Sequence, residues 1–298
     1  MRFLDADAVA ALGPAAAVSA ITVALRGGLD PAADPARVSV GLTHGQFLLM
    51  PSEAPTAAGI KVVTVAPDNP THRLPRIQAV YLLFDRETLA LRAVLDGTAL
   101  TTLRTPAVSV AAVLHWLPDR PLRVAVVGAG PQATAHVSTL AAFRPLESAS
   151  YLVRDPSRTP LAAVGLGSPR ADEALRSSDV VVCATSARTP VFDSRLLRDD
   201  AVVVAVGSHE PDARELDAPL LGRATVVVED VATALREAGD VVLAMAEGTL
   251  TSADLVSMRD VVTGAVAVPA GRPLVFKSVG MSWQDLVVAA AVVERNGG

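Results

Sequence analysis

One glycine-rich turn has the residue types and spacing to hold a dinucleotide. It lies between an apolar run that ends at Val127 and a helix-like run that begins at Pro131. Gly128 permits the tight turn, Gly130 removes a side chain that would keep a diphosphate from the backbone, and Ala133 allows close helix packing. The N–H groups of the first helical turn then bind the diphosphate. The predicted cofactor residues here are Gly128, Ala129, Gly130, Pro131, Gln132 and Ala133.

Two arginines follow the second apolar strand of the same region. Arg154 and Arg158 flank Asp155, where an acidic residue binds an adenosine ribose or a basic one meets a 2′-phosphate. Two guanidinium groups favour the phosphate, so we predict NADP, with NAD as the alternative. The other interpretation is that Asp155 caps the next helix and both arginines are solvated. Thr185 and Ser186, after a later apolar run, are also expected to bind the cofactor.

Lysine is rare in this chain, and Lys61 and Lys277 are its only examples. A compact ammonium group with a movable pKa performs acid–base chemistry that guanidinium cannot. Lys61 therefore becomes a candidate, and Arg104 is a second cation in the N-terminal part. From the residues alone, a strand-edge charge at Lys61 and a helix-surface ion pair at Arg104 are the favoured interpretations.

The composition limits the class of protein. The chain has 298 residues, 51% apolar content, a net charge of -5 and one cysteine. These values fit two domains with large cores, and they provide no basic field for nucleic acid. Asp5 and Asp7 do not fit a signal peptide, and no apolar run is long enough to span a membrane. We expect a cytoplasmic protein with no membrane partner and no metal site.

The hydrophobic pattern predicts two kinds of architecture. Residues up to about 26 and residues 101–117 read as helices, and 118–121 read as a domain boundary. Between the two helices lie strand candidates, which indicate a mixed or antiparallel sheet: 47–50, 60–65 and 79–84. The stretch from Met50 to Ala58 contains a loop with no clear placement.

Strands and helices then alternate. The strand candidates are 123–127, 150–153, 180–184, 201–206, 225–228 and a last one within 274–280. Alternation of this kind predicts an α/β fold, with a Rossmann-type doubly wound parallel sheet.

A series of short motifs resembles the ornithine cyclodeaminase and mu-crystallin family. The resemblance runs from about Arg37 to Asp285, nearly the whole chain. The motifs occur in the family's order: Met50-Pro51, Gly59-Ile60-Lys61, Asp96-Gly97, Thr101 to Thr105, Val127 to Ala133, Arg214 to Asp217 and Phe276 to Gly280. The resemblance implies a homodimer that interconverts amino and imino acids with a nicotinamide cofactor. It also implies a discontinuous α+β substrate-binding and dimerisation domain (1–118, completed by 276–298) beside a Rossmann domain (119–275).

The resemblance assigns roles to single positions. Arg37 and Arg104 correspond to the family's carboxylate-binding arginines, and such forks would fix a small substrate for hydride transfer. Lys61 matches the family's lysine; it would hold the carboxylate or move a proton if neighbouring positive charge lowers its pKa. The further expected contacts are Met50 and Glu53 with the substrate, Ser278, Val279 and Gly280 with the nicotinamide, and Asp285 at the final helix. A solvated turn residue is an equal alternative for Glu53.

Two departures from the family pattern affect the predicted reaction. Pro106 follows Thr105, and proline is tolerable there only within a first helical turn. His209 stands where members that release ammonia have an aspartate, and histidine shuttles protons but supplies no fixed negative charge. We therefore rank reduction of an α-imino acid, such as pyrroline- or piperideine-2-carboxylate, above amino-acid dehydrogenation and ornithine cyclisation. His209 is expected to act in catalysis, and a non-catalytic binding protein of this fold is the remaining alternative.

Overall fold

A computed structural model describes residues 2–267 and 269–297, which divide into two compact units. The first unit runs to Val108 and resumes at Met281, and the second extends from Ser109 to Gly280. The first division falls inside helix α3 (Gly97–Val113), earlier than residues 118–121. The end of α3 belongs to the second unit, where the Ser109 hydroxyl hydrogen-bonds to His136.

The first unit contains a six-stranded sheet with the order β1-β6-β5-β4-β3-β2. Its strands are β1 (Arg2–Leu4), β2 (Val38–Leu42), β3 (Gly45–Ala54), β4 (Ala57–Val65), β5 (Ile77–Asp85) and β6 (Leu91–Asp96). Strands β2 to β6 pair antiparallel in chain order, and β1 pairs parallel with β6. The expected loop from Met50 to Ala58 is a hairpin instead, because β3 and β4 stay paired up to the tight turn between Ala54 and Ala57.

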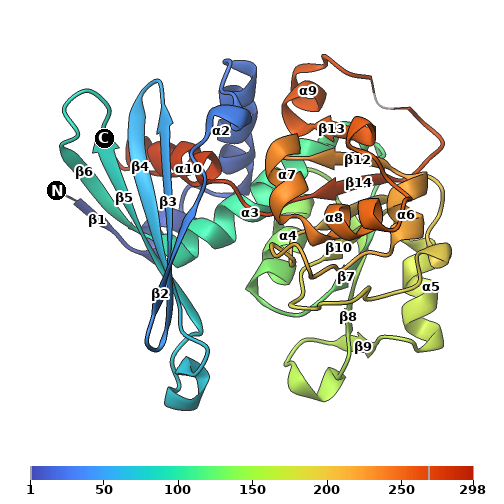
Figure 1. Ribbon diagram of the computed structural model, residues 1–298. Helices are drawn as coiled ribbons and strands as arrows, with labels where there is room; N and C mark the ends of the chain where they lie inside the picture. The colour runs from blue at the N-terminus through green and yellow to red at the C-terminus, as the bar shows by residue number, and fades with distance from the viewer. Residues whose placement is uncertain (1, 268, 298) are drawn as a thin grey trace. The chain divides into compact units, whose positions relative to one another are not determined.

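Only one face of this sheet is covered within the unit. Its helices are α1 (Ala6–Ala10), α2 (Pro14–Arg26) and α10 (Ser282–Arg295), with short 3-10 turns at Pro31–Ala33 and Asn69–His72. Helix α10 packs on β3, β4 and β5, and Figure 1 shows it behind these strands. Along β4, buried residues alternate with half-buried ones, so a period of two separates a covered face from an open face.

Helix α3 contains Pro106 well beyond its first turn. The expectation that proline here requires a helix start was therefore wrong. Proline removes one backbone hydrogen bond and crowds the preceding turn. The helix continues because its side chains from Arg104 through Val113 are buried on all sides, and this packing outweighs the local preference.

The second unit is built on an eight-stranded parallel sheet with the order β13-β12-β14-β11-β10-β7-β8-β9. The strands are β7 (Leu122–Val127), β8 (Leu146–Val153), β9 (Ala163–Gly165), β10 (Val180–Cys183), β11 (Val202–Ala205), β12 (Thr225–Val228), β13 (Leu255–Ser257) and β14 (Leu274–Lys277). The helices are α4 (Pro131–Ala141), α5 (Pro169–Ser177), α6 (Ala218–Arg223), α7 (Val231–Glu237), α8 (Gly239–Ala246) and α9 (Met258–Thr263). Short 3-10 turns lie at Leu114–Trp116, Pro156–Arg158, Ser194–Leu196 and Ser252–Asp254.

The central strands of this sheet are buried on both faces, which explains their continuous apolar runs. Every residue of β10, β11 and β12 is buried. Helices α5, α6 and α8 contribute to the core on one face, while α4 packs on β7, β8 and β10. The prediction of an α/β fold with a Rossmann-type parallel sheet is confirmed.

Candidate functional site

The first unit buries a cluster of opposite charges. Lys61 Nζ lies 2.7 Å from Asp285 Oδ2, and Arg104 Nε lies 3.2 Å from Asp285 Oδ1. A second guanidinium nitrogen of Arg104 donates to Gln284 Oε1 at 2.7 Å. All four residues are buried, and we call them the Asp285 cluster. Two cations share one carboxylate, so the cluster retains positive charge that suits an anionic ligand.

Three elements position this cluster. Lys61 lies on central strand β4, opposite Met50 of β3 and Tyr81 of β5, on the face that α10 covers. Arg104 comes from α3, while Gln284 and Asp285 lie in the first turn of α10. The ordinary alternatives for both cations are excluded, because Lys61 is not on an edge strand and Arg104 is only 5% exposed.

Burial is the main reason that the pKa of Lys61 falls to about 8. The positive charges of Arg104 and Arg37 lower this pKa further, whereas Asp285 raises it. Neighbouring positive charge, the cause expected from sequence, is therefore secondary to desolvation. A lysine with this pKa changes charge close to neutral pH, so it can bind an anion or exchange a proton.

The loop before β2 brings two more charged groups to this face. Arg37 is half-buried there and acts electrostatically on Lys61. Asp34 of the same loop accepts hydrogen bonds from the Ser52 hydroxyl at 2.6 Å and from the Trp283 backbone at 2.9 Å. Burial raises the pKa of Asp34 to about 6. Sequence reasoning did not select Asp34, and its only signal was its position three residues before Arg37.

The β3–β4 hairpin separates the two other expected substrate contacts. Met50 is buried on the face of Lys61. Glu53 pairs with Ala58, so strand alternation directs it to the opposite face. Glu53 is exposed there and forms an ion pair with Arg86 at 2.8 Å. This placement corrects the expected substrate contact and supports the alternative of a solvated residue.

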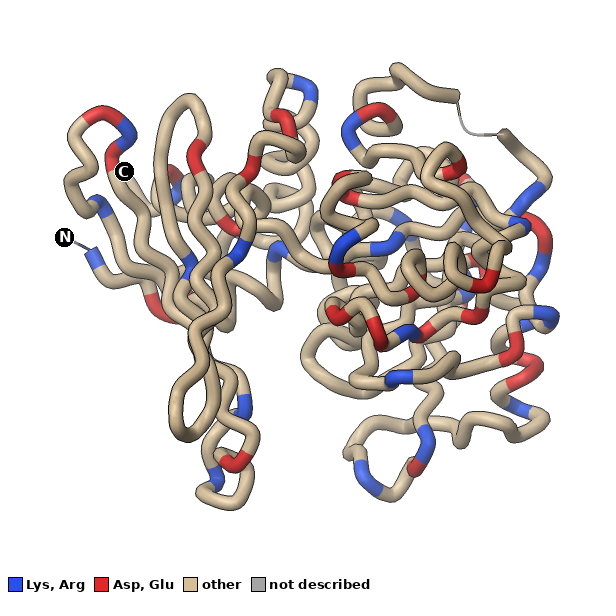
Figure 2. The backbone as a smooth tube through the Cα atoms, viewed as in Figure 1, with Lys and Arg blue, Asp and Glu red and all other residues tan. Residues whose placement is uncertain are grey.

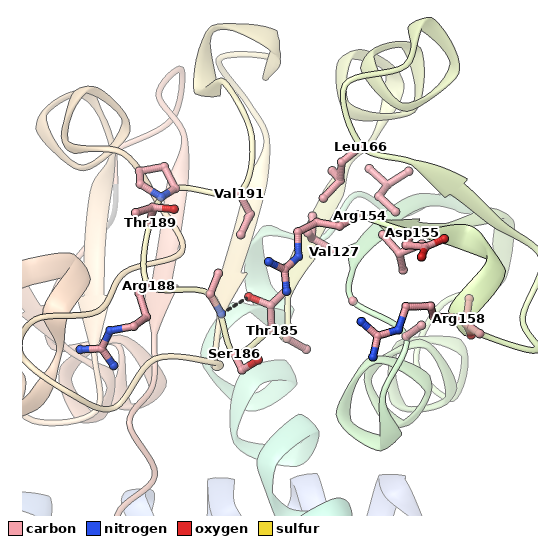
Figure 3. Close-up of a pocket in the computed structure, with 18 residues that line it drawn as sticks. Val127, Arg154, Asp155, Arg158, Leu166, Thr185, Ser186, Arg188, Thr189 and Val191 are labelled. Carbon is pink, nitrogen blue, oxygen red and sulfur yellow. Dashed lines mark hydrogen bonds between the residues drawn. The ribbon is translucent and has the colours of Figure 1, made fainter.

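The second unit has a cavity of about 940 Å³ at the carboxyl ends of its strands. Among the expected cofactor residues, those that line it are Gly128, Ala129, Arg154, Arg158, Thr185 and Ser186. Figure 3 shows Arg154 and Arg158 extending toward the same part of this cavity. Parallel α/β sheets bind ligands at this edge, where the chain order reverses, here between β7 and β10.

The glycine turn fits a diphosphate in detail. Gly128 has a φ of 120°, and a Cβ atom there would lie 2.5 Å from the Ala184 carbonyl oxygen. A Cβ at Gly130 would meet nothing within 4 Å, so the space beside the turn is open. Gly130 is also the N-cap of α4 and provides no side-chain cap, which leaves the first N–H groups for a ligand. Pro131 occupies the first helical turn and Ala133 is fully buried, as predicted.

Asp155 lines this cavity and bonds to the residue two positions along the chain. Its Oδ1 atom accepts hydrogen bonds from the Ser157 backbone at 3.0 Å and from the Ser157 hydroxyl at 2.6 Å. These bonds hold the pKa of Asp155 below its usual range. The carboxylate therefore caps the following 3-10 turn, and exposed Arg154 and Arg158 are the charged groups beside it.

Two buried glutamates hold the loops that follow the C-terminal ends of the parallel strands. Glu215 accepts bonds at 2.7 Å from the backbone N–H groups of Thr185 and Gly207. Glu229 accepts bonds from the Ser278 hydroxyl at 2.8 Å and the Val279 backbone at 2.7 Å. Ser278, Val279 and Gly280 follow β14 and are not among the residues that line the cavity. The sequence did not identify either glutamate as a residue that holds these loops, although Glu215 belongs to the family motif Arg214 to Asp217.

Lys277, the second lysine, forms buried contacts that stabilise a loop of the second unit. Its Nζ atom donates to the Ser208 carbonyl oxygen at 2.6 Å and lies 3.0 Å from Asp240 Oδ2. Both charged side chains are fully buried. These contacts hold the loop after β11, which carries exposed His209. Glu210 and Asp212 of the same loop pair with Arg188, which lines the cavity.

Comparisons with known proteins agree with this arrangement. The model of the ornithine cyclodeaminase/mu-crystallin family matches residues 15–298. The chain belongs to this family. It is 34% identical to Delta(1)-pyrroline-2-carboxylate reductase 2 of Burkholderia ambifaria, over 89% of this chain and 86% of the relative. It is also 34% identical to the ketimine reductase mu-crystallin of Rattus norvegicus, over 84% of this chain and 81% of that protein.

A solved structure of the family shows the same fold. Delta(1)-pyrroline-2-carboxylate reductase of Thermococcus litoralis, in complex with NADH and L-proline, superposes with a TM-score of 0.88 and 26% identity. The match covers 99% of this chain and 97% of that one. The resemblance inferred from the motifs is thus confirmed, as is the prediction of an NAD(P)-dependent oxidoreductase acting on a C=N bond.

No helix in the described part of the chain is long and apolar enough to cross a membrane. Figure 2 shows acidic and basic residues interspersed along both units.

Proposed function

We propose that the protein uses NAD(P)H to reduce a small α-imino acid, such as pyrroline- or piperideine-2-carboxylate, to the amino acid. The observation that carries this proposal is the Asp285 cluster, where Lys61 and Arg104 are buried around one carboxylate. Their excess positive charge provides a site for the substrate carboxylate. The reductases among the relatives support the same reaction class.

In this mechanism Asp285 and Gln284 act on the cations rather than on the substrate. They hold Arg104 by two hydrogen bonds, so its remaining donors meet the substrate carboxylate in a defined orientation. Arg37 supplies a second guanidinium from its loop. Met50, on the same face as Lys61, provides an apolar wall against the substrate ring.

Reduction adds a hydride to the imine carbon and requires a proton on the nitrogen. The nicotinamide cofactor supplies the hydride when it is bound. Lys61, with its pKa of about 8, holds the substrate carboxylate and can exchange a proton near neutral pH. His209, on the loop after β11, is the second candidate proton donor.

The position of His209 also supports reduction over loss of ammonia. A cyclodeaminase has to stabilise a cationic iminium, for which a carboxylate in this loop would supply fixed negative charge. The two acidic residues beside His209 in this loop, Glu210 and Asp212, are already paired with Arg188.

We infer a preference for NADP(H) over NAD(H). Arg154 and Arg158 line the cavity, while the Asp155 carboxylate is bonded to Ser157. Two guanidinium groups in one cavity suit a 2′-phosphate.

A homodimer is supported by the open face of the first unit's sheet. Strand alternation places a set of half-buried or exposed apolar side chains on that face: Val38, Val40, Leu42, Phe47, Leu49, Ile60, Val62, Val80, Leu82 and Phe84. An apolar sheet face of this extent is typical of an interface. A second copy of the chain would bury it.

The decisive experiment follows the absorbance of NADPH or NADH in the presence of a panel of cyclic and linear α-imino acids. We expect rapid oxidation of the reduced cofactor, with the corresponding amino acid as the product. The same preparation is incubated with ornithine and NAD(P), and ammonia is measured. Ammonia and proline formation without imine reduction would replace the proposed reaction with cyclodeamination. Cofactor binding without any turnover would favour a binding protein.

A further inference from the structure

Helix α10 begins without a cap of its own. Its N-cap residue is Met281, whose side chain makes no capping hydrogen bond. The first N–H groups of a helix need acceptors, above all in a buried location. The position of this first turn matters for the site, because its residues Gln284 and Asp285 bind Arg104 and Lys61.

A carboxylate from a distant part of the chain supplies the acceptor. Asp34 Oδ2 accepts from the Trp283 backbone N–H at 2.9 Å, and the Ser282 backbone also bonds to Asp34. The negative charge faces the positive end of the helix dipole. Asp34 therefore does for α10 what an N-cap side chain does for an ordinary helix.

The same carboxylate contacts the sheet. Asp34 Oδ1 accepts from the Ser52 hydroxyl at 2.6 Å, and Ser52 lies on the covered face of β3, two residues after Met50. Because Asp34 and Arg37 belong to one short loop, this contact also restrains the loop that carries Arg37.

We propose that Asp34 is a positioning residue, which ties the Arg37 loop, strand β3 and the start of α10 into one carboxylate-binding frame. This inference rests on the proposed imino acid reduction for its kinetic effect, and on the geometry alone for its structural effect. Asp34 acts through Arg37, Arg104 and Lys61. Its loss should therefore weaken substrate binding more than it slows the chemical step.

The test compares Asp34→Ala, which removes both contacts, with Asp34→Asn, which keeps an acceptor of similar shape, and Ser52→Ala, which removes one contact. We expect Asp34→Ala to raise KM for the imino acid about tenfold, because the Arg37 loop and the start of α10 lose the contacts that orient the carboxylate-binding groups, with a smaller change in kcat. Asp34→Asn and Ser52→Ala should fall between Asp34→Ala and the native protein. Asp68→Asn is the matched control, because Asp68 is an exposed carboxylate whose side chain makes no capping bond.

Tryptophan fluorescence gives a readout that does not depend on activity. The chain has two tryptophans, Trp116 and Trp283, so a Trp116→Phe background isolates the residue that bonds to Asp34. Trp283 is 1% exposed. We expect Asp34→Ala to shift its emission to longer wavelength and to increase its quenching by acrylamide. Circular dichroism confirms that each variant is folded.

The kinetic and fluorescence results together distinguish failure of the proposed reaction from failure of the positioning role of Asp34. If the native protein reduces no imino acid, the proposed function fails, and the fluorescence of Trp283 still decides whether Asp34 holds the start of α10. An unchanged KM together with unchanged Trp283 emission in Asp34→Ala would overturn the positioning role. A fall in kcat alone, with KM and emission unchanged, would also overturn it, because Asp34 would then act on the reacting atoms.

Discussion

Lys61 Nζ donates a hydrogen bond to Asp285 Oδ2 at 2.7 Å, although the two residues are 224 positions apart in the sequence. The bond joins a central strand of the first sheet to the last helix of the chain. Arg104 bonds to the other oxygen of the same carboxylate. Asp285 thus fixes the spacing of the two cations before any substrate binds, and this preorganisation is what a small carboxylate ligand requires.

Arg104→Ala should cause the largest loss of activity among the arginine variants. The substitution removes one arm of the carboxylate site together with the buried hydrogen bonds from Arg104 to Gln284 and Asp285. We expect kcat/KM for the imino acid to fall about a hundredfold or more. Arg92→Ala, at an exposed arginine of β6, is the control and should retain native kinetics. Equal kinetics of the two variants would exclude a carboxylate contact by Arg104.

Substrate binding should weaken as the pH rises through about 8. The pKa of Lys61 is lowered from 10.5 to about 8, so its side chain is positive below this pH and neutral above it. Loss of the charge removes attraction for the substrate carboxylate, and KM should therefore rise on the alkaline side. Lys61→Met has no proton to lose, so its KM should be high at every pH without this step. A step of the same size in Lys61→Met would assign the titration to another group.

Arg154→Ala combined with Arg158→Ala should change the choice of cofactor. Each guanidinium is expected to contribute on the order of 1 kcal/mol through charge-assisted bonds to the 2′-phosphate. The double variant should raise KM for NADPH and leave KM for NADH nearly unchanged. Arg170→Ala, at an exposed arginine that does not line the cavity, is the control. Equal losses with both cofactors would refute the assignment.

His209→Asp tests the ranking of the reactions. The native protein should reduce imino acids and release no ammonia from ornithine. The aspartate variant introduces fixed negative charge in the loop after β11, so a trace of deamination is the expected gain. Ammonia production is measured against His209→Asn, which introduces no charge. Rapid ammonia release by the native protein would reverse the ranking and give His209 the proton-transfer role of a cyclodeaminase.

The native protein should be a dimer in light scattering at micromolar concentration. Val40→Lys places a charge on the open sheet face and should shift the mass toward the monomer. Val23→Lys is the matched control, because Val23 is an exposed valine on α2. A monomeric native protein, or equal effects of both variants, would contradict an interface on this face.

The core of the nucleotide-binding unit could be predicted from the amino-acid sequence. Its central strands β10, β11 and β12 are buried on both faces, so each appears as a continuous apolar run, and β12 begins and ends at the expected residues. The turn after β7 could also be predicted, because Gly128 occupies a backbone region that few other residues adopt. An apolar run and a glycine-rich turn each depend on residues that are neighbours in the chain, so both can be recognised in the sequence.

The strands of the first sheet were harder to predict because only one face of that sheet is covered within its own unit. Strand alternation alone would direct Lys61 to solvent and Ile60 and Val62 to the core. The structure has the reverse, with Lys61 2% exposed and its apolar neighbours on the open face. Strand β2 was missed for a related reason, since it has no buried residue that would mark a core face.

Which charged side chains contact one another could not be predicted from the sequence and follows from the packing of distant elements. Asp34, Lys61, Arg104 and Asp285 come from a loop, a strand and two helices, and no spacing in the sequence relates them. The sequence could supply the candidates, because a rare lysine and a set of motifs are visible residue by residue. Their shared burial depends on α10 returning to the first sheet, and desolvation by that packing is what lowers the pKa of Lys61.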